Sequence, residues 1–207
     1  MTLVYNIGYH LSKLVAATLF RYRVIHPERM IEHGGLILAV NHTSYFDPPL
    51  AGICSQRAVY YLARETLLQW PILGPLFPDM NVIPVDRDGA DRTALKTIVR
   101  KIRQGNGVVL FPEGTRSKNG TLQAARPGLG LIIAKTLCPV LPMRIFGAAH
   151  AFPRGAKFPR PVRIVTVIGN PLYFSEADIH PSSKETYSRL SQRVMDAIGA
   201  LELKEKP

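Results

Sequence analysis

Cysteine is almost absent from the sequence, which contains only Cys54 and Cys138. Two cysteines this far apart form neither a disulfide framework nor the closely spaced pairs of a structural metal site. Their scarcity excludes the small, disulfide-stapled class of secreted domains and favours a reducing compartment. The chain has 207 residues, 46% of them hydrophobic, which is enough for one globular domain with a sizeable core.

Acidic residues are also scarce. Asp and Glu number 15 against 26 Lys and Arg, so the net charge is +11. An excess of this size favours anionic partners, which include nucleic acid, an acidic membrane surface and phosphorylated small molecules. No recognised nucleic-acid motif accompanies the charge, so we do not expect nucleic acid to be the partner.

The N-terminal segment has no acidic residue before Glu28 and little polarity of any kind. Placed on a helix, residues 3–20 are apolar around most of the circumference, and one narrow stripe comprises Asn6, His10, Lys13, Ala17 and Arg21. Such a helix is about 27 Å long, just short of a bilayer core, and Lys13 near its middle would cost ~2.5–3.5 kcal/mol in hydrocarbon. We therefore predict an amphipathic membrane-surface helix over residues 1–22 and one further domain over residues 23–207. A core helix docked on its own domain is the alternative.

Short apolar runs alternate along the chain with helix-length periodic segments. We expect strands at residues 36–40, 58–63, 81–85, 107–111, 139–147 and 163–169. We expect helices near residues 47–55, 89–104, 127–137 and 182–203. This order predicts an α/β fold with a largely parallel or mixed central sheet flanked by helices, preceded by the membrane-surface helix.

The helix expected at residues 89–104 has one basic side. Its cations are spaced by three and four residues and so lie on a common face, which comprises Arg92, Lys96, Arg100 and Arg103. A solvated surface and an attraction to an anionic bilayer both explain this face, and the two interpretations stay open.

The stretch "NHTSYFDP" at residues 41–48 follows a buried strand and contains two groups suited to proton transfer. Pro48 and Pro49 suit the first turn of a helix, so we expect Asp47 to be its N-cap. His42 would then face Asp47 across a short turn, with the carboxylate accepting the Nδ1 proton and Nε2 left free as a base. We interpret Ser44 as turn-forming, because no nucleophile elbow surrounds it. A decorated turn without catalysis is the alternative.

A second group of candidate residues, "FPEGTRS" at residues 111–117, begins where the strand expected at residues 107–111 ends. Glu113 can accept from a hydroxyl, Gly114 permits close backbone approach, and Thr115 and Arg116 can donate to a phosphate. Other strand ends contribute Arg64 and Arg87. Because open α/β sheets place their sites where strands end, these side chains are expected to converge.

These two motifs together resemble those of the glycerolipid acyltransferases, specifically the bacterial-type 1-acyl-sn-glycerol-3-phosphate acyltransferases. Two further blocks, "VIPVDRD" with Arg87 and "PVLPMRI" with Pro142, resemble the family's and occur in the same order. The resemblance covers about residues 30–170. The sequence departs from the family's pattern at two positions that bear on substrate choice. In "ARPG", Arg126 keeps the positive charge of the family's usual lysine, but the aromatic residue before it is missing. Arg64 stands where the family commonly has a lysine.

The resemblance implies an enzyme that transfers a fatty acyl group from acyl-CoA or an acyl-carrier protein to the sn-2 hydroxyl of lysophosphatidic acid, giving phosphatidic acid for phospholipid synthesis. In such an enzyme, His42 would be the general base and Asp47 would orient the imidazole. The acceptor would be bound by Arg64, Arg87, Glu113, Gly114, Thr115, Arg116 and Arg126. No cofactor and no metal are implied, and the enzyme is expected at the cytoplasmic face of the cell membrane, as a peripheral or monotopic protein.

Three other functions stay open on the sequence. One is acyl transfer to another lysolipid, such as a lyso-ornithine lipid. The others are an acyl thioesterase, in which water replaces the glycerol hydroxyl, and a non-catalytic protein that binds membranes through its basic charge.

Overall fold

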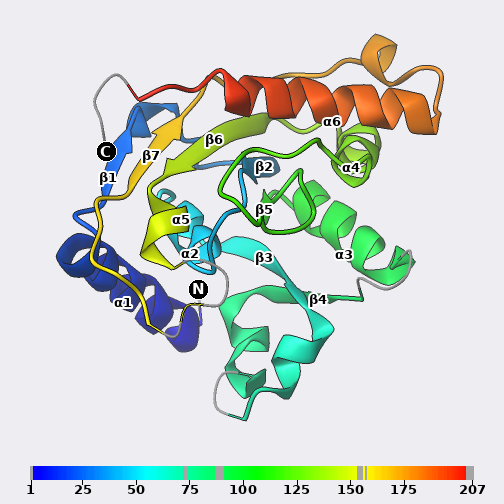
Figure 1. The fold of residues 1–207 in the computed structure, drawn as a ribbon. Coiled ribbons are helices and arrows are strands. Elements are labelled where there is room, and N and C mark those ends of the chain that lie inside the picture. Colours follow the sequence, from blue (N-terminus) through cyan, green and yellow to red (C-terminus); the bar gives the residue numbers. More distant parts are fainter. Residues whose placement is uncertain (1, 72–73, 87–90, 153–155, 157, 204–207) are drawn as a thin grey trace.

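The computed structural model describes residues 2–71, 74–86, 91–152, 156 and 158–203. Seven strands of this part of the chain form one sheet in the order β1-β7-β6-β2-β5-β3-β4 (Figure 1). Their bounds are β1 Arg23–Ile25, β2 Leu36–Val40, β3 Val59–Arg64, β4 Val82–Val85, β5 Gly107–Leu110, β6 Val140–Phe146 and β7 Val165–Ile168. All neighbours are parallel except β6 and β7, which are antiparallel. The predicted mixed α/β sheet is confirmed.

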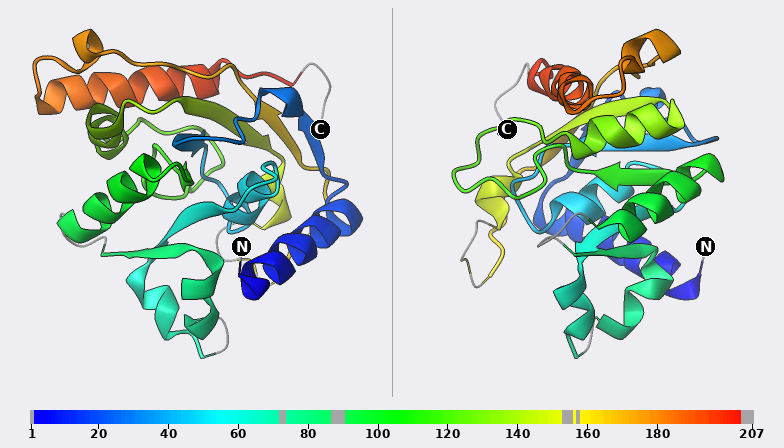
Figure 2. Two further views of the ribbon diagram at one scale, coloured as in Figure 1. Left: turned by 180° about the vertical axis from the view of Figure 1, so that it is seen from behind. Right: turned by 90° about the vertical axis from the view of Figure 1, so that its right-hand side faces the viewer.

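Helices cover both faces of this sheet (Figures 1 and 2). One face carries α1 Leu3–Leu19, α2 Asp47–Gly52 and α5 Ala148–Ala151, and the other carries α3 Arg92–Arg103, α4 Gly128–Thr136 and α6 Lys184–Gly199. Strand β2 lies in the middle and is fully buried, with Leu36, Leu38 and Val40 in the first core and Ile37 and Ala39 in the second. The two-residue alternation of strand side chains therefore divides the interior into two cores.

Most predicted elements are present with shifted ends. The helix expected at residues 89–104 begins at Arg92, because Asp91 is its N-cap and its carboxylate accepts from the Ala94 N–H at 2.8 Å; residues 89–90 lie outside the described part of the chain. The helix expected at residues 182–203 is α6, capped by Ser183. Strand β1 and the four-residue helix α5 were not predicted, since neither has a long enough apolar pattern.

Helix α1 is docked on the first core and also exposes apolar side chains. Ala16 and Phe20 are buried in that core, and Tyr9 Oη donates to the Ser55 carbonyl at 3.0 Å. Its outward side chains, with 58–75% of their surface exposed, are Leu3, Ile7, Leu11 and Leu14. Among the described residues, we find no helix that combines the length and the apolar character needed to cross a membrane.

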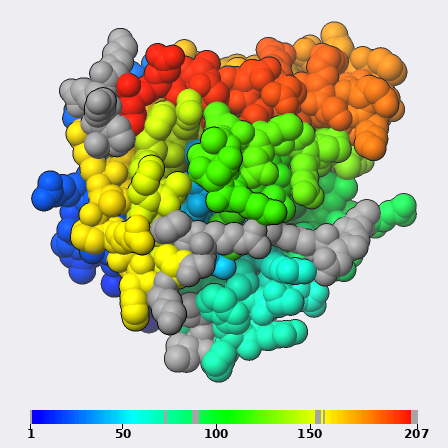
Figure 3. Space-filling view, viewed as in Figure 1, coloured from blue at the N-terminus to red at the C-terminus, as the bar shows by residue number. Residues whose placement is uncertain are grey.

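The parallel strands β2, β5, β3 and β4 all end at the same end of the sheet, called the C-terminal end below. The sequence motifs containing His42, Glu113 and Arg64 directly follow or end these strands. In the space-filling view this end faces the reader, and a small blue area, in the colour of the chain near the end of β2, shows between green and yellow atoms (Figure 3). The segment that follows β2 reaches the surface at this end, since half of Tyr45 is exposed.

Candidate active site

Asn41 fixes the chain where β2 ends. Its side chain is buried and bonds the β6 backbone in both directions: Nδ2 donates to the Ile145 carbonyl at 3.1 Å, and Oδ1 accepts from the Ile145 N–H at 2.7 Å. This side-chain pair replaces the ladder bonds that the backbone gives up as it leaves the sheet. The next residue, His42, is thereby held at a defined point.

The His42 backbone is bound to the loop that follows β5. The His42 N–H donates to Glu113 Oε1 at 2.8 Å, and the His42 carbonyl accepts from the Ser117 N–H at 2.8 Å. The ring stacks on Phe111, with centroids 3.9 Å apart and planes 19° apart. Three contacts from one loop therefore orient the histidine.

The imidazole faces Asp47 across the turn. His42 Nδ1 lies 3.0 Å from Asp47 Oδ2, and the two side chains have 9% and 0% of their surface exposed. The same oxygen accepts from the N–H groups of Thr43 at 2.6 Å and Ser44 at 2.7 Å. An acceptor at Nδ1 favours the tautomer with its proton on that atom, which leaves Nε2 with a free lone pair.

The expectation that Asp47 is the N-cap of α2 is wrong. Asp47 is the first residue of the helix, and Phe46 is the cap. An N-cap side chain bonds the N–H two or three residues ahead, but Pro49 has no N–H and the Leu50 N–H donates to the Phe46 carbonyl at 3.0 Å. The carboxylate therefore bonds backward into the turn, which is what brings it to His42.

Ser44 is fully buried in this turn. Its Oγ lies 3.3 Å from the Phe46 N–H, from which it accepts, and 3.4 Å from the Phe152 carbonyl. The interpretation of Ser44 as turn-forming is confirmed by these contacts, because the hydroxyl has no exposed surface from which to attack a substrate.

Glu113 has a different environment from the one expected of an acceptor-binding group. Its side chain is buried, and its two oxygens accept from the N–H groups of His42 at 2.8 Å and Gln123 at 3.2 Å. Burial raises the pKa of the Glu113 carboxyl above its usual value, and the two backbone hydrogen bonds oppose that rise. The structure thus gives Glu113 a role in holding His42 and the loop, not a surface for a substrate hydroxyl.

Gly114 and Arg126 lie against each other beside this carboxylate. Gly114 has φ 71°, in the left-handed region, and a Cβ at this position would lie 2.7 Å from Arg126 Cδ. The Arg126 N–H also donates to the Pro112 carbonyl at 2.8 Å, and the Arg126 side chain is exposed. The glycine therefore admits an arginine next to the loop that holds His42.

Arg116 and Tyr45 connect the two motifs at the surface. The Arg116 guanidinium lies over the Tyr45 ring, 3.5 Å from its centroid, and half of Tyr45 is exposed. Tyr45 also lies 5.8 Å from the Phe152 ring. Thr115, between Gly114 and Arg116, is half-buried. A half-buried, ring-supported guanidinium is well suited to bind an anionic group near His42.

The remaining predicted site residues are less closely associated. Arg64 is exposed and ends β3, which is two strands from β2 at the C-terminal end of the sheet. Arg87 follows β4 and lies outside the described residues. Within the described part of the chain, no group of three or more His, Cys, Asp or Glu side chains is placed to hold a metal ion.

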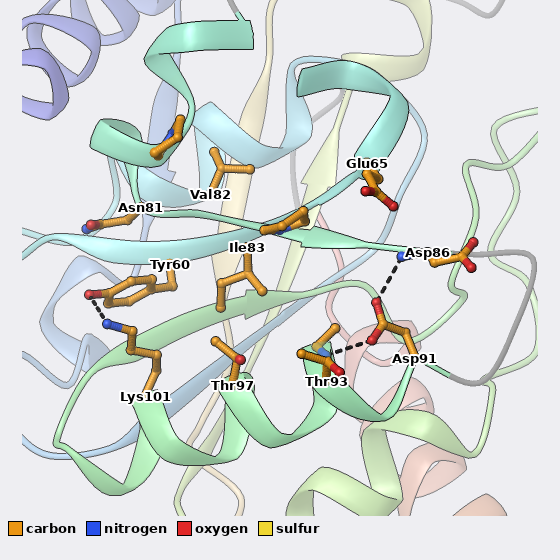
Figure 4. A pocket seen from close by; sticks show the side chains of 13 residues that line it. Tyr60, Glu65, Asn81, Val82, Ile83, Asp86, Asp91, Thr93, Thr97 and Lys101 are labelled. Carbon is orange, nitrogen blue, oxygen red and sulfur yellow. Dashed lines mark hydrogen bonds between the residues drawn. The ribbon is translucent and has the colours of Figure 1, made fainter. Parts of the chain in front are cut away.

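A hollow of about 420 Å³ between β4 and α3 is separate from this cluster. Figure 4 shows Val82 and Ile83 along it, Tyr60 and Lys101 at one end, and three carboxylates toward the other: Glu65, Asp86 and Asp91. Like charge would repel a phosphate there, so this hollow does not suit a phosphorylated headgroup.

Sequence reasoning missed Asn41, Phe111 and Tyr45. Each lies beside a motif residue, yet the contact that defines it crosses the fold: Asn41 to Ile145, Phe111 to His42, and Tyr45 to Arg116. The polar and aromatic types of these residues were the only signal, and such types are also common in ordinary turns.

Comparison with known proteins finds matches both in sequence and in structure. The model of the family described as Acyltransferase matches residues 21–146. The chain is 30% identical, over 67% of its length, to a chloroplastic 1-acyl-sn-glycerol-3-phosphate acyltransferase of Brassica napus, and it spans only 41% of that relative. It is 24% identical to the 1-acyl-sn-glycerol-3-phosphate acyltransferase of Bacillus subtilis, with 88% of each chain covered.

A solved structure shares the fold. The crystal structure of the 1-acyl-sn-glycerophosphate acyltransferase PlsC from Thermotoga maritima superposes with a TM-score of 0.73, at 24% identity, over 97% of this chain and 81% of the other. At this identity the likeness establishes the α/β architecture, including the helices that flank the sheet.

Proposed function

The chain belongs to the acyltransferase family, and from that premise we propose that it transfers a fatty acyl group from an acyl thioester to the sn-2 hydroxyl of lysophosphatidic acid, giving phosphatidic acid. The observation that carries the proposal is the 3.0 Å contact between His42 Nδ1 and Asp47 Oδ2, beside a loop that presents Arg116. A base and a cation side by side suit an acceptor that has both a hydroxyl and a phosphate.

The chemistry needs a base because a glycerol hydroxyl is not ionised at neutral pH. His42 Nε2 takes the hydroxyl proton as the oxygen attacks the thioester carbonyl carbon. Asp47 keeps the ring oriented and stabilises the imidazolium that forms. The tetrahedral intermediate then collapses, the C–S bond breaks, and the imidazolium returns its proton to the leaving thiolate. The products are the ester and a free thiol, and no cofactor takes part.

For the acceptor we propose a phosphate site built from arginines. Arg116 and Arg126 flank the Glu113–Gly114 turn, Arg64 ends β3, and Arg87 follows β4 in the sequence. Thr115 and the Gly114 backbone lie between the first two. Arginine suits phosphate because its planar fork donates two parallel hydrogen bonds. Glu113 would act here as a positioning residue for His42.

For the membrane we propose that residues 1–22 hold the enzyme on one leaflet, at the cytoplasmic face, as the membrane-associating unit of an acyltransferase domain over residues 23–207. The exposed Leu3, Ile7, Leu11 and Leu14 of α1 support this, because a monomeric soluble domain gains nothing from an apolar outer stripe. Lysolipids and long acyl chains concentrate at that surface.

One reaction series separates the candidate functions. The purified protein is mixed with an acyl thioester, with and without lysophosphatidic acid, and free thiol and phosphatidic acid are measured. Thiol release that depends on lysophosphatidic acid supports the proposal, release without any acceptor indicates a thioesterase, and no release indicates a non-catalytic protein. Faster transfer to a lyso-ornithine lipid than to lysophosphatidic acid would assign the other acceptor.

Arg116→Ala tests the phosphate site. We expect it to raise the KM for lysophosphatidic acid by about tenfold or more, since a hydrogen bond to a charged group contributes roughly 1.5–3 kcal/mol. The KM for the thioester should change little. Steady-state kinetics with each substrate varied in turn measures both values. An equal rise in the KM for a phosphate-free lysolipid would show that Arg116 does not recognise the phosphate.

A further inference from the structure

The outer face of α3 carries a row of cations. Arg92, Lys96 and Arg100 are exposed and repeat every four residues, and their side chains make no hydrogen bond or ion pair with the described residues. Arg103 continues the row and donates from Nη2 to the Lys135 carbonyl of α4 at 2.7 Å. Lys135 is itself exposed, so two helices contribute to one positive surface.

Helix stability does not account for the whole row. Cations in the last turn, such as Arg100 and Arg103, interact favourably with the helix dipole. Arg92, in contrast, is the first residue of α3, where the dipole disfavours a positive charge. Lys96 lies one turn from cations on both sides, and like charges at that spacing destabilise a helix. Arg92 and Lys96 therefore lower the stability of α3, which indicates that the row has a function outside the fold.

The surface is also hollowed. A groove of about 670 Å³ runs between α3 and α4, and Leu95 and Val99 form its apolar part. The cations around it are Arg92, Lys96, Arg100, Arg103 and Lys135, and none of the described residues that line it carries a carboxylate. An apolar centre with a charged rim is the arrangement of a protein-binding surface, whereas a merely solvated helix face needs no groove.

The groove faces away from the proposed membrane contact. Helix α1 covers one face of the sheet, and α3 and α4 cover the opposite face, so the whole sheet lies between them (Figures 1 and 2). A bilayer lying against Leu3, Ile7 and Leu11 of α1 therefore does not reach α3. Of the two interpretations of the basic face, this geometry disfavours anionic lipid and favours a partner in solution.

We infer that the groove between α3 and α4 docks the acidic face of a protein that carries the acyl thioester, so that the donor is an acyl-carrier protein. The inference rests on the proposed acyl transfer and selects between its two donors. From Arg92 to Arg103 the row extends about 16 Å along α3, a length that suits the acidic side of a helix better than the compact phosphates of a nucleotide.

The path of the chain brings the docked carrier to the reacting group. Helix α3 follows β4 and precedes β5, which is parallel to β3 and β2, so its first turn lies at the C-terminal end of the sheet. That is also where His42 is. A carrier seated along the groove has one end at this level, from which its flexible prosthetic arm can present the thioester.

Lys96→Glu tests the docking, with Lys184→Glu as the matched control. Both residues are exposed lysines on helices, and Lys184 lies on α6. Glutamate at position 96 would lie between Arg92 and Arg100 at helix spacing, so α3 should not be destabilised. We expect Lys96→Glu to raise the KM for palmitoyl-acyl-carrier protein by about tenfold at low salt and less at high salt. The KM for palmitoyl-CoA should stay within twofold, and the control should leave both unchanged.

Direct binding of the carrier protein to wild type and Lys96→Glu, measured by titration calorimetry, should show the same loss. Equal KM changes for both donors, or unaltered carrier binding, would overturn the inference. So would a wild type that uses palmitoyl-CoA and ignores the carrier. A fall in binding to anionic lipid vesicles at constant carrier KM would assign the groove to lipid instead. Failure of the wild type with either donor would contradict the proposed function itself, which is a separate result.

Discussion

At the scale of single residues, one carboxylate oxygen organises the turn that carries His42. Asp47 Oδ2 accepts from two backbone N–H groups and from the imidazole, so the turn and the ring are fixed together. These partners lie within five residues of one another, which is why the sequence alone predicted that His42 and Asp47 would meet. The bond between the His42 N–H and Glu113 spans 71 residues and depends on the sheet placing β5 beside β2.

Tyr45 is predicted to position Arg116 for the acceptor. Replacing Tyr45 by alanine removes the ring beneath the guanidinium, a contact that contributes ~0.5–1 kcal/mol at an exposed site. We expect a two- to fivefold rise, to order of magnitude, in the KM for lysophosphatidic acid, with kcat nearly unchanged. Tyr45→Phe keeps the ring and should restore the wild-type KM. If the phenylalanine variant is as impaired as the alanine variant, the ring contact is not what matters.

Glu113→Gln should alter how stability depends on pH. Because burial raises the pKa of Glu113, the folded state binds the proton more tightly than the unfolded chain does. This contribution to the free energy of unfolding is fully present below the unfolded pKa, near 4.3, and is lost as pH rises through the folded pKa. Glutamine does not titrate. The stability of the variant relative to wild type should therefore increase as pH rises from about 4 through the folded pKa.

Urea unfolding of both proteins across that pH range measures the difference. A relative stability that stays constant, or that falls as pH rises, would contradict the raised pKa of Glu113.

At the scale of elements, the strands with a clear apolar run were predicted from the sequence, whereas the short strand β1 was not. Residues 36–40 match β2 at both ends, because a fully buried strand is apolar at every position. Strand β1 has only three residues and exists by pairing with β7, more than a hundred positions away in the sequence. The antiparallel direction of β7 likewise depends on how β6 and β7 are connected, which side-chain periodicity does not encode.

Helix α1 combines the two interpretations that the sequence left open. Its inner side is docked through Ala16, Phe20 and the tyrosine hydroxyls, and its outer side exposes leucines and an isoleucine. Removing the whole helix would expose the core, so it is a poor test of membrane binding. Substitutions confined to the outer side separate the two roles.

The double variant Ile7→Gln, Leu11→Gln is expected to bind anionic lipid vesicles at least tenfold more weakly, with an unchanged melting temperature. Each side chain is 58% exposed, so its loss costs the fold little, whereas burying it in lipid contributes roughly 1.5–3 kcal/mol. Ala17→Gln is the matched control, because Ala17 is exposed on the predicted polar stripe. Vesicle sedimentation measures the binding, and undiminished binding of the double variant would show that α1 does not insert.

At the scale of the whole molecule, the sheet separates two surfaces of different chemical character. The face covered by α1 presents apolar side chains, the face covered by α3 and α4 presents a basic groove, and the cluster around His42 lies at the end of the sheet between them. The net charge of +11 indicated anionic partners without saying how the charge is distributed. Only the positions of α1 and α3 on opposite faces assign the apolar and basic surfaces to different sides.

We propose that His42 is the base for acyl transfer to the lysolipid hydroxyl. The kcat of purified His42→Ala, with saturating acyl thioester and lysophosphatidic acid, measures this role once circular dichroism and thermal melting have shown that the variant is folded. We expect a loss of roughly 10²–10⁴-fold in kcat, which is the contribution of general-base catalysis. A folded His42→Ala protein that turns over at nearly the wild-type rate would contradict it.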